Sequence, residues 1–415
     1  MSPRVQTALV RLGRYWRQLF LALLLVCVVA RSPDLFTNPR FWAEEGRDAF
    51  AVAWSEPWYV ALLHPHKDFF YLTMNLATLV AASVFSLEVA PLVTTTVALA
   101  VQMAVFWYIL FPLSNSLNKV QQMALALVAL FVGNTGETWL STTTVQFQLA
   151  ILTFLILLRH RPAEDRQSWL SLELAFLTMA GLTGPVSNLL LPAFALAWWK
   201  SRESAQALFC IVLTVTTLVQ LGYFVTNADL GRERLVVSHL SGTTIEIWLR
   251  QFLLWPILGH GAQAAISSSV VQGALAGLIG AAAAWTTASS RRRELWLTLV
   301  GFLLVSWGSL LGSPGMRGGW RYVYAPAVML LSIFVLSLQE RKQSRVRWLS
   351  AAAILIALLS WIASYRTSLG PWIVEDRPSW AGEIAKWRQD PSYRLRISPQ
   401  WEGRSWTVDL LGEER

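Results

Sequence analysis

The sequence predicts an all-α polytopic membrane protein with about 11 transmembrane helices. Of the 415 residues, 54 % are hydrophobic and only 14 % are charged, whereas soluble proteins average roughly 45–50 % and about 25 %. Many of the 22 Trp residues stand at the ends of apolar runs, and aromatic rings favour the headgroup level of a bilayer. This composition argues against a soluble enzyme, a disordered chain and a disulfide-stabilised secreted domain.

Apolar segments divide most of the chain. They cover residues 15–30, 69–86, 89–111, 120–133, 144–158, 170–184, 186–199, 205–225, 266–287, 295–311, 322–338 and 348–363. Several are shorter than the roughly 20 residues that cross a bilayer unaided, so we expect protein to surround their ends.

Basic residues predict the orientation of the chain. Four arginines lie before or at the start of the first apolar segment without an acidic residue among them: Arg4, Arg11, Arg14 and Arg17. Further basic clusters lie at 200–202, 291–293 and 341–347. Because Lys and Arg collect in cytoplasmic loops, we expect a cytoplasmic N-terminus and an external C-terminus in a bacterial-type plasma (inner) membrane. The net charge of +9 is then explained by these loops, and no nucleic-acid partner is expected.

This orientation needs an odd number of crossings, so one of the twelve apolar segments should not cross, or two of them should form a single span. Two arrangements stay open. In the first, a segment within 69–133 lies in the membrane plane or is re-entrant. In the second, 170–199 is one long span broken at Gly184-Pro185. The first is preferred because it brings the polar stretch 134–142 to the external side.

The chain divides into a membrane domain, residues 1–363, and a small external α+β tail, residues 364–415. In the tail, Trp380, Ile384 and Trp387 share one face of a helix that starts after Ser379, and two strand-like runs follow. A piece this small should pack on the membrane domain.

Two adjacent carboxylates, Glu44 and Glu45, lie in the predicted external first loop (residues 31–68), in the sequence RFWAEEG. A helical wheel puts Glu44 and Asp48 on the polar face of an interfacial helix. Neighbouring carboxylates near a low-dielectric surface are suited to general-base work or metal binding, because mutual repulsion and burial raise one pKa. The alternative is a solvated face with an Arg40–Glu44 ion pair.

Other polar residues gather in the same predicted external regions. His64, His66 and Lys67 follow the carboxylates and could bind phosphate or a metal, or anchor the next span. Asn134, Glu137, Gln146 and Gln148 could line a cavity or hydrogen-bond between helices. The two cysteines, Cys27 and Cys210, lie in apolar runs, so a disulfide or a cysteine-based zinc site is not expected.

The predicted external late loop (residues 312–321) carries Arg317 and Arg321 in a Gly-rich turn, and Tyr322 follows. A guanidinium beside flexible backbone N–H groups is suited to a phosphate headgroup. Arg250, in a second external stretch, is a further candidate. The alternative is that Arg and Tyr anchor the span at the interface.

The acidic motif after the first span and the Arg321-Tyr322 to Pro326 stretch resemble the GT-C superfamily of membrane glycosyltransferases. The resemblance implies a sugar carried on a polyprenyl phosphate, held at the phosphate by Arg321 with Arg317 and Tyr322. It also implies that Glu44 or Glu45 accepts the proton of the acceptor hydroxyl in an inverting displacement. The acceptor would be a glycan, lipid or protein of the cell envelope. No cofactor is certain, and a divalent metal stays open.

The small tail differs from the large soluble domain of the oligosaccharyltransferase-like branch of that superfamily, which leaves the acceptor undefined. Two other functions stay open: a transporter or flippase of a lipid-linked or polar substrate, and a noncatalytic subunit of a cell-envelope assembly. Transporters usually carry internal repeats and ionisable residues deep in their spans. Neither feature is evident in this sequence.

Overall fold

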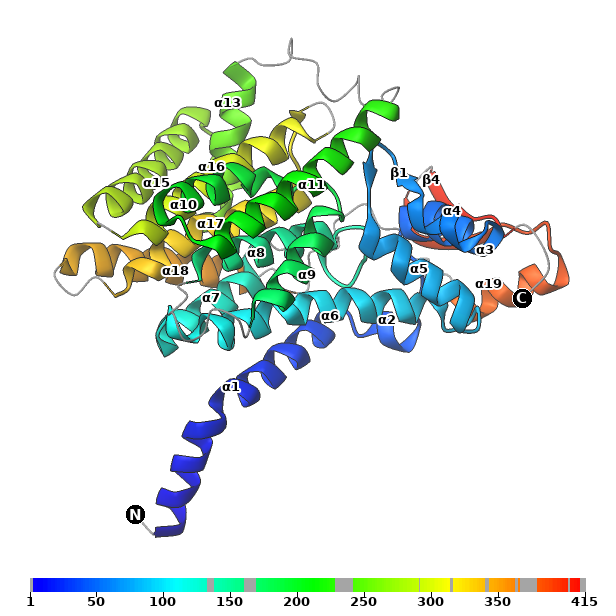
Figure 1. Ribbon diagram of the computed structural model, residues 1–415, viewed down its shortest axis with the longest axis horizontal. Helices are drawn as coiled ribbons and strands as arrows, with labels where there is room; N and C mark the ends of the chain where they lie inside the picture. Colours follow the sequence, from blue (N-terminus) through cyan, green and yellow to red (C-terminus); the bar gives the residue numbers. More distant parts are fainter. Residues whose placement is uncertain are drawn as a thin grey trace.

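The computed structural model describes residues 3–132, 138–159, 169–227, 242–290, 292–313, 316–339, 343–362, 365, 379–401 and 404–410. Within these residues the chain is mostly helical, and the strands form two small antiparallel pairs, β1–β2 and β3–β4. Figure 1 shows a bundle of helices with the short elements of the first loop and the tail gathered at one side.

The described elements follow one another along the chain. They are α1 (Pro3–Arg31), α2 (Asp34–Thr37), the π-helix η1 (Glu45–Phe50), α3 (Ala51–Ser55), α4 (Trp58–Leu63), β1 (Pro65–His66), β2 (Phe69–Phe70), α5 (Leu72–Val84), α6 (Ala90–Leu110), η2 (Pro112–Asn115), α7 (Lys119–Phe131), α8 (Val145–Leu158), α9 (Leu170–Gly181), η5 (Ser187–Leu190), α10 (Leu191–Ser201) and α11 (Ser204–Thr226). They continue with α13 (Gly242–Trp248), the π-helix η7 (Leu249–Leu254), α14 (Trp255–Ala264), α15 (Ser269–Ser289), α16 (Arg293–Leu311), α17 (Trp320–Ser337), α18 (Ser344–Ile362), α19 (Trp380–Gln389), β3 (Leu395–Trp401) and β4 (Arg404–Val408).

Two helices form the centre of the bundle. Every residue of α8 is buried, and so is the stretch 323–336 of α17. Both sequences are apolar on all sides, which is the pattern of a helix surrounded by other helices. The helices α6, α7, α9 and α16 pack around them.

Outer helices expose aliphatic side chains. On α11, Ile211, Val215 and Leu218 are each more than half exposed. Among the described residues, five helices are long and apolar enough to span a membrane: Ala90–Asn115, Ser204–Thr226, Ser269–Ser289, Arg293–Leu311 and Ser344–Ile362. The predicted class of mostly helical, multi-pass membrane protein is therefore confirmed, and lipid is the solvent that suits these exposed faces. The count of eleven crossings stays a prediction.

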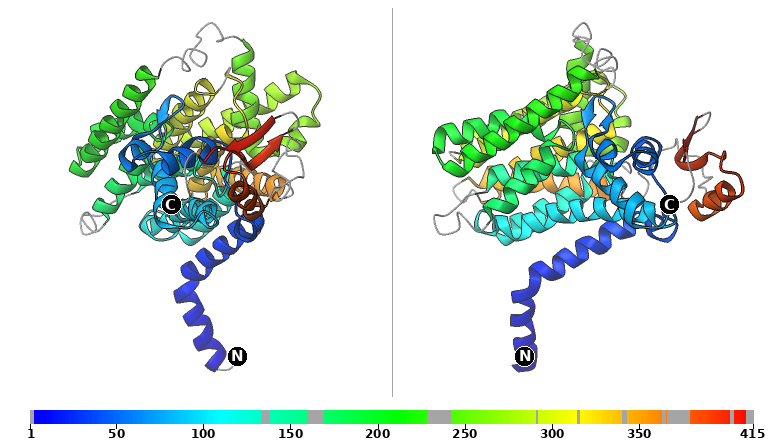
Figure 2. Two further views of the ribbon diagram at one scale, coloured as in Figure 1. Left: turned by 90° about the vertical axis from the view of Figure 1, so that its right-hand side faces the viewer. Right: turned by 45° about the vertical axis from the view of Figure 1, so that its right-hand side comes forward.

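A second, smaller core joins the first loop to the tail. The ring of Phe41 packs edge-on against Trp380 at 5.3 Å, and Trp54 packs likewise against Trp387 at 6.3 Å. The indole N–H of Trp380 donates to the Leu87 carbonyl at 2.8 Å. The views in Figure 2 show β3 and β4 beside the helices of the first loop. The tail thus packs on the membrane domain through buried aromatic side chains.

The tail helix begins and ends where the sequence predicts. The Ser379 side chain accepts a hydrogen bond from the Gly382 N–H and caps α19, and Asp390 ends the helix. Trp380, Ile384 and Trp387 are all buried on its inner face. Their spacing of four and three residues places them on one side of the helix.

Residue 46 allows only a glycine where the tail meets the first loop. A Cβ atom there would lie 2.7 Å from the Cβ of Phe41 and 2.8 Å from the Cδ1 of Ile397. Both distances are shorter than van der Waals contact, so the strand β3 rests directly on the start of η1. The first loop therefore depends on the tail for its position.

We expect Trp380→Ala to lower the free energy of unfolding by about 3–5 kcal/mol, because it removes the largest fully buried side chain of this core. Thermal unfolding of the purified protein in detergent measures the effect. The control is Trp348→Ala on α18, whose side chain is 69 % exposed. Equal shifts for the two variants would contradict a structural role for the tail.

Candidate active site

A pocket lies where the first loop meets the starts of α8 and α17. Its lining residues are Glu44, His66, Lys67, Phe69, Tyr71, Thr143, Thr144, Gln146, Arg321 and Tyr322. The cavity is small, about 50 Å³, and open on one side. A larger ligand would therefore occupy its mouth. The early carboxylate and the late guanidinium lie in one pocket, although most of the chain separates them in sequence.

The backbone before Glu44 is held by the tail. The Ala43 N–H donates to the Ser398 carbonyl at 2.5 Å, and the Ser398 N–H donates to the Phe41 carbonyl at 3.1 Å. Ala43 has a positive φ of 43°, an unfavourable conformation for a non-glycine residue. This turn, fixed by β3, carries the chain into η1 and puts Glu44 at the pocket.

Glu44 forms an ion pair with Lys67. The Lys67 Nζ donates to Glu44 Oε1 at 2.8 Å. Burial disfavours ionisation of Glu44, but the charge and hydrogen bond of Lys67, with a contribution from Arg321, lower its pKa to about 2. Glu44 is thus ionised at neutral pH. The alternative interpretation, an ion pair between Arg40 and Glu44, required both residues to lie on one helix. Arg40 lies outside any helix.

Glu45 points away from this pocket. Its Oε1 accepts hydrogen bonds from the Thr142 N–H at 3.1 Å and from the Thr142 hydroxyl, and its Oε2 accepts from the Trp42 N–H at 3.3 Å. Burial raises the pKa of Glu45, and these hydrogen bonds oppose the rise. Glu45 therefore ties the first loop to the segment before α8, while Glu44 faces the pocket.

His66 and Lys67 occupy a tight hairpin. His66 pairs with Phe69, which leaves Lys67 at the turn with a φ of 54°. The imidazole of His66 packs edge-on against Tyr71 at 5.6 Å, and its buried Nε2 has no hydrogen-bond partner among the described residues. Burial lowers the pKa of His66 to about 4, so the ring is neutral at neutral pH.

Arg321 follows a turn that glycines make possible. Gly318 and Gly319 have φ values of 68° and 130°, which favour glycine. The Gln251 side chain braces this turn: its Oε1 accepts from the Gly319 N–H and its Nε2 donates to the Arg317 carbonyl, each at 3.0 Å. Gln251 thus positions the turn before Arg321. This role was not predicted from the sequence, although the neighbouring Arg250 is a predicted candidate for a phosphate ligand.

Gln146 joins two walls of the pocket. Its Nε2 donates to the Tyr71 hydroxyl at 2.9 Å. Tyr71, Phe69, Thr143 and Thr144 line the pocket without having been singled out in the sequence. The one feature of the sequence that could have indicated them is their position within four residues of Lys67 or Gln146.

Several predicted residues do not line the pocket. Asp48 pairs with its neighbour Arg47 at 2.6 Å, and Arg250 lies 3.5 Å from Glu246 on an exposed helix face. The Gln148 side chain donates to the Thr138 carbonyl. The other residues concerned are Arg317, which is exposed, and His64, whose pKa is lowered by burial. Asn134 and Glu137 lie outside the described residues.

In the described part of the chain, no group of three or more His, Cys, Asp or Glu residues has the geometry of a metal site. The pocket itself combines one carboxylate, two cationic side chains and a neutral imidazole. Its sum of charges is +1, which suits an anionic ligand.

No protein-family model matches the sequence, and searches of curated proteins and of solved structures gave no match. The pocket is therefore the feature from which a function can be inferred.

The Glu44–Lys67 pair predicts a pH dependence of stability. The pKa of Glu44 is about 2 in the folded protein, against 4.5 without these contacts. Its ionised form therefore stabilises the fold fully above pH 4.5, and this contribution is lost as the pH falls toward 2. We expect Glu44→Gln to lower the thermal midpoint at neutral pH, and the gap from the natural protein to narrow on acidification. Tryptophan fluorescence melts between about pH 3 and pH 7 measure it.

The control for this series is Glu56→Gln, which removes an exposed carboxyl of the same loop. It should leave the midpoint almost unchanged at every pH. A gap for Glu44→Gln that widens on acidification would contradict the ion pair.

Proposed function

We propose that this chain is an integral-membrane glycosyltransferase that moves a sugar from a polyprenyl phosphate to a cell-envelope acceptor. The observation that carries the proposal is the meeting of Glu44, Lys67 and Arg321 in one pocket. A carboxylate beside two cations supplies the two things that transfer from a phosphate carrier needs: a proton acceptor and a site for the leaving phosphate.

The cations hold the donor phosphate. Arg321 presents a planar guanidinium, which binds phosphate oxygens in pairs. Lys67 adds an ammonium group, and its side chain is 42 % exposed, so it is accessible to a ligand. As the bond between the anomeric carbon and the phosphate oxygen breaks, its electron pair moves to that oxygen. The two cations stabilise the negative charge that develops there.

Glu44 accepts the proton. The acceptor hydroxyl oxygen forms a bond to the anomeric carbon from the side opposite the phosphate, and its proton passes to Glu44. In the free pocket Lys67 and Arg321 keep the pKa of Glu44 too low for an efficient base. A bound phosphate draws both cations to itself and thereby raises the pKa of Glu44. The base is therefore activated by the donor.

Neutral groups complete the pocket. The Nε2 of His66, which has no partner among the described residues, and the amide of Gln146 offer hydrogen bonds to sugar hydroxyls. The rings of Tyr71 and Tyr322 offer apolar surface for the face of a pyranose. Together they favour an uncharged hexosyl or pentosyl group next to the phosphate.

The reaction would take place on the external side of the membrane. The basic clusters of the sequence favour an external pocket in a bacterial-type inner membrane, with the N-terminus in the cytoplasm. The donor would then enter from the outer leaflet. No metal is assigned a role in the transfer.

The two central helices favour a transferase over a transporter. Between residues 149 and 158 of α8 the only polar side chain is Thr153, and between 325 and 336 of α17 it is Ser332. Both stretches are buried. A polar substrate crossing the bundle would need ionisable or hydrogen-bonding groups along these two central helices.

We expect Glu44→Gln to reduce sugar transfer by about 10²–10⁴-fold, because it removes the proton acceptor while preserving shape. Membranes that contain the variant are supplied with labelled polyprenyl-phosphosugar, and label in acceptor material is counted. The matched control, Glu56→Gln, should retain activity. Unchanged transfer by Glu44→Gln would exclude the general-base role, and a protein that supports envelope assembly without any transfer would be a noncatalytic subunit.

Arg321→Gln should raise the KM for the lipid-linked donor about tenfold or more, because a charge-assisted contact to phosphate is worth roughly 1.5–3 kcal/mol. The matched control is Arg250→Gln, which removes an exposed guanidinium outside the pocket. Donor titrations of the two variants measure the difference. Equal KM values would remove Arg321 from the phosphate site.

A further inference from the structure

A second cavity lies at the other end of the two central helices. It is larger than the first, about 280 Å³, which is close to the lower end of the roughly 300–1,000 Å³ of ligand sites. Leucines form its apolar wall: Leu113, Leu117, Leu158 and Leu336. Asn115, Ser116, Arg292 and Glu294 form its polar wall.

The two cavities lie toward opposite ends of α8 and α17. On α17, Arg321 lines the first cavity and Leu336 the second. Fifteen residues of helix at about 1.5 Å each place them roughly 22 Å apart. Gln146 and Leu158 on α8 are divided between the cavities in the same way. With a hydrocarbon core about 30 Å thick, a first cavity at one membrane face would put the second cavity well inside the opposite leaflet, toward its headgroups.

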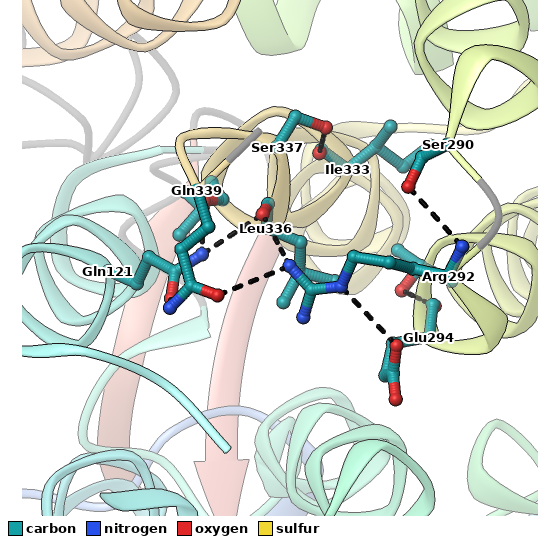
Figure 3. Close-up of polar contacts among 10 residues, drawn as sticks. Gln121, Ser290, Arg292, Glu294, Ile333, Leu336, Ser337 and Gln339 are labelled. Atoms are coloured by element: carbon teal, nitrogen blue, oxygen red, sulfur yellow. Dashed lines mark hydrogen bonds and ion pairs between the residues drawn. The ribbon is translucent and has the colours of Figure 1, made fainter. Parts of the chain in front are cut away.

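Arg292 is held rigidly at the edge of this cavity (Figure 3). Its Nη1 donates to the Leu336 carbonyl at 3.1 Å and to the Gln339 Oε1 at 3.4 Å. The Gln121 amide donates to the same Leu336 carbonyl at 3.0 Å, and Gln339 donates to Gln121 at 2.5 Å. These contacts fix the guanidinium by one edge. Its Nη2 makes no hydrogen bond to any described residue, so it can bind a ligand.

Glu294 places a negative charge beside this cation. Its Oε2 lies 3.5 Å from Arg292 Nε, a separation longer than a strong hydrogen bond. Its side chain is 30 % exposed, so the carboxylate can reach a ligand. The adjacent Arg293 turns away and donates to the Ala197 carbonyl at 3.0 Å. The cavity thus offers one cation, one anion and four leucines.

This combination fits a zwitterion attached to an apolar chain. A phosphodiester binds a guanidinium, and a primary ammonium has three N–H donors for a carboxylate. A purely anionic headgroup would meet repulsion from Glu294. A quaternary choline group has no N–H to donate to the carboxylate.

We propose that the cavity between η2, α8, α16 and α17 binds an ethanolamine phospholipid, with its phosphate on Arg292 and its ammonium group on Glu294. The four leucines contact the glycerol and the first carbons of the acyl chains. Basic pockets between helices near a membrane face are known lipid-headgroup sites. The carboxylate of Glu294 makes this cavity selective for a headgroup with a primary ammonium. The assignment is independent of sugar transfer.

Lipid binding to the purified full-length protein tests the proposal. Phosphatidylethanolamine, phosphatidylcholine and phosphatidylglycerol with the same acyl chains are titrated into the protein in detergent, and bound lipid is read by native mass spectrometry. We expect phosphatidylethanolamine to bind about tenfold or more tightly than either of the others, the factor that corresponds to about 1.4 kcal/mol. Equal affinity for the three lipids would overturn the proposal.

Two variants assign the contacts. Glu294→Gln should abolish the preference for phosphatidylethanolamine over phosphatidylcholine, and Arg292→Gln should weaken binding of both. The controls are Glu246→Gln and Arg250→Gln, an exposed pair away from the cavity, which should keep the preference. Should Arg292→Gln fail to fold, Glu294→Gln alone decides, since an unchanged preference in that variant contradicts the proposal.

Soluble phosphoethanolamine separates a lipid from a free metabolite. It carries the same charged groups but lacks the acyl chains, so we expect it to bind at least tenfold more weakly than the lipid. Binding as tight as that of the lipid would overturn the lipid assignment, because the leucines would then contribute nothing.

Discussion

The packing of the tail on the first loop fixes the position of Glu44. The helices η1, α3 and α4 have six residues or fewer, and isolated helices shorter than about 12–15 residues are marginal in water. Their stability must come from tertiary contacts. The Phe41–Trp380 contact and the close approach of Ile397 to Gly46 supply these contacts. The described tail residues do not line the pocket, yet the carboxylate depends on them.

Two adjacent glutamates have different environments because their neighbours differ. Glu45 is fully enclosed and accepts hydrogen bonds from Thr142 and Trp42, so its oxygens are occupied. Glu44 has a cation within 2.8 Å and an open pocket beside it. Glu45 aligns the loop with α8, and Glu44 remains available to a ligand. Identical side chains thus lie in two different environments, one closed by hydrogen bonds and one open to the pocket.

The sequence predicted those features that local chemistry decides. Composition gave the membrane class, and the Ser379 cap with its apolar spacing gave the tail helix. The positive-inside rule placed Glu44 and Arg321 on one side. The Lys67 partner of Glu44 could not be predicted, because it depends on a hairpin packed against distant helices. The number of crossings could not be predicted from the sequence, because α7, α8 and α9 are shorter than a full span and α8 is surrounded by protein along its whole length.

The charges of the pocket explain why proton transfer and phosphate departure would assist one another. With His66 kept neutral by burial, Glu44, Lys67 and Arg321 sum to +1, which one phosphodiester neutralises. Once Glu44 takes the proton, the residues sum to +2. The leaving phosphate monoester then carries about −1.5 to −2. The pocket and its ligand would therefore stay neutral or nearly neutral from the bound donor to the products of the proposed transfer, because the proton that Glu44 takes up offsets the charge that the leaving phosphate gains.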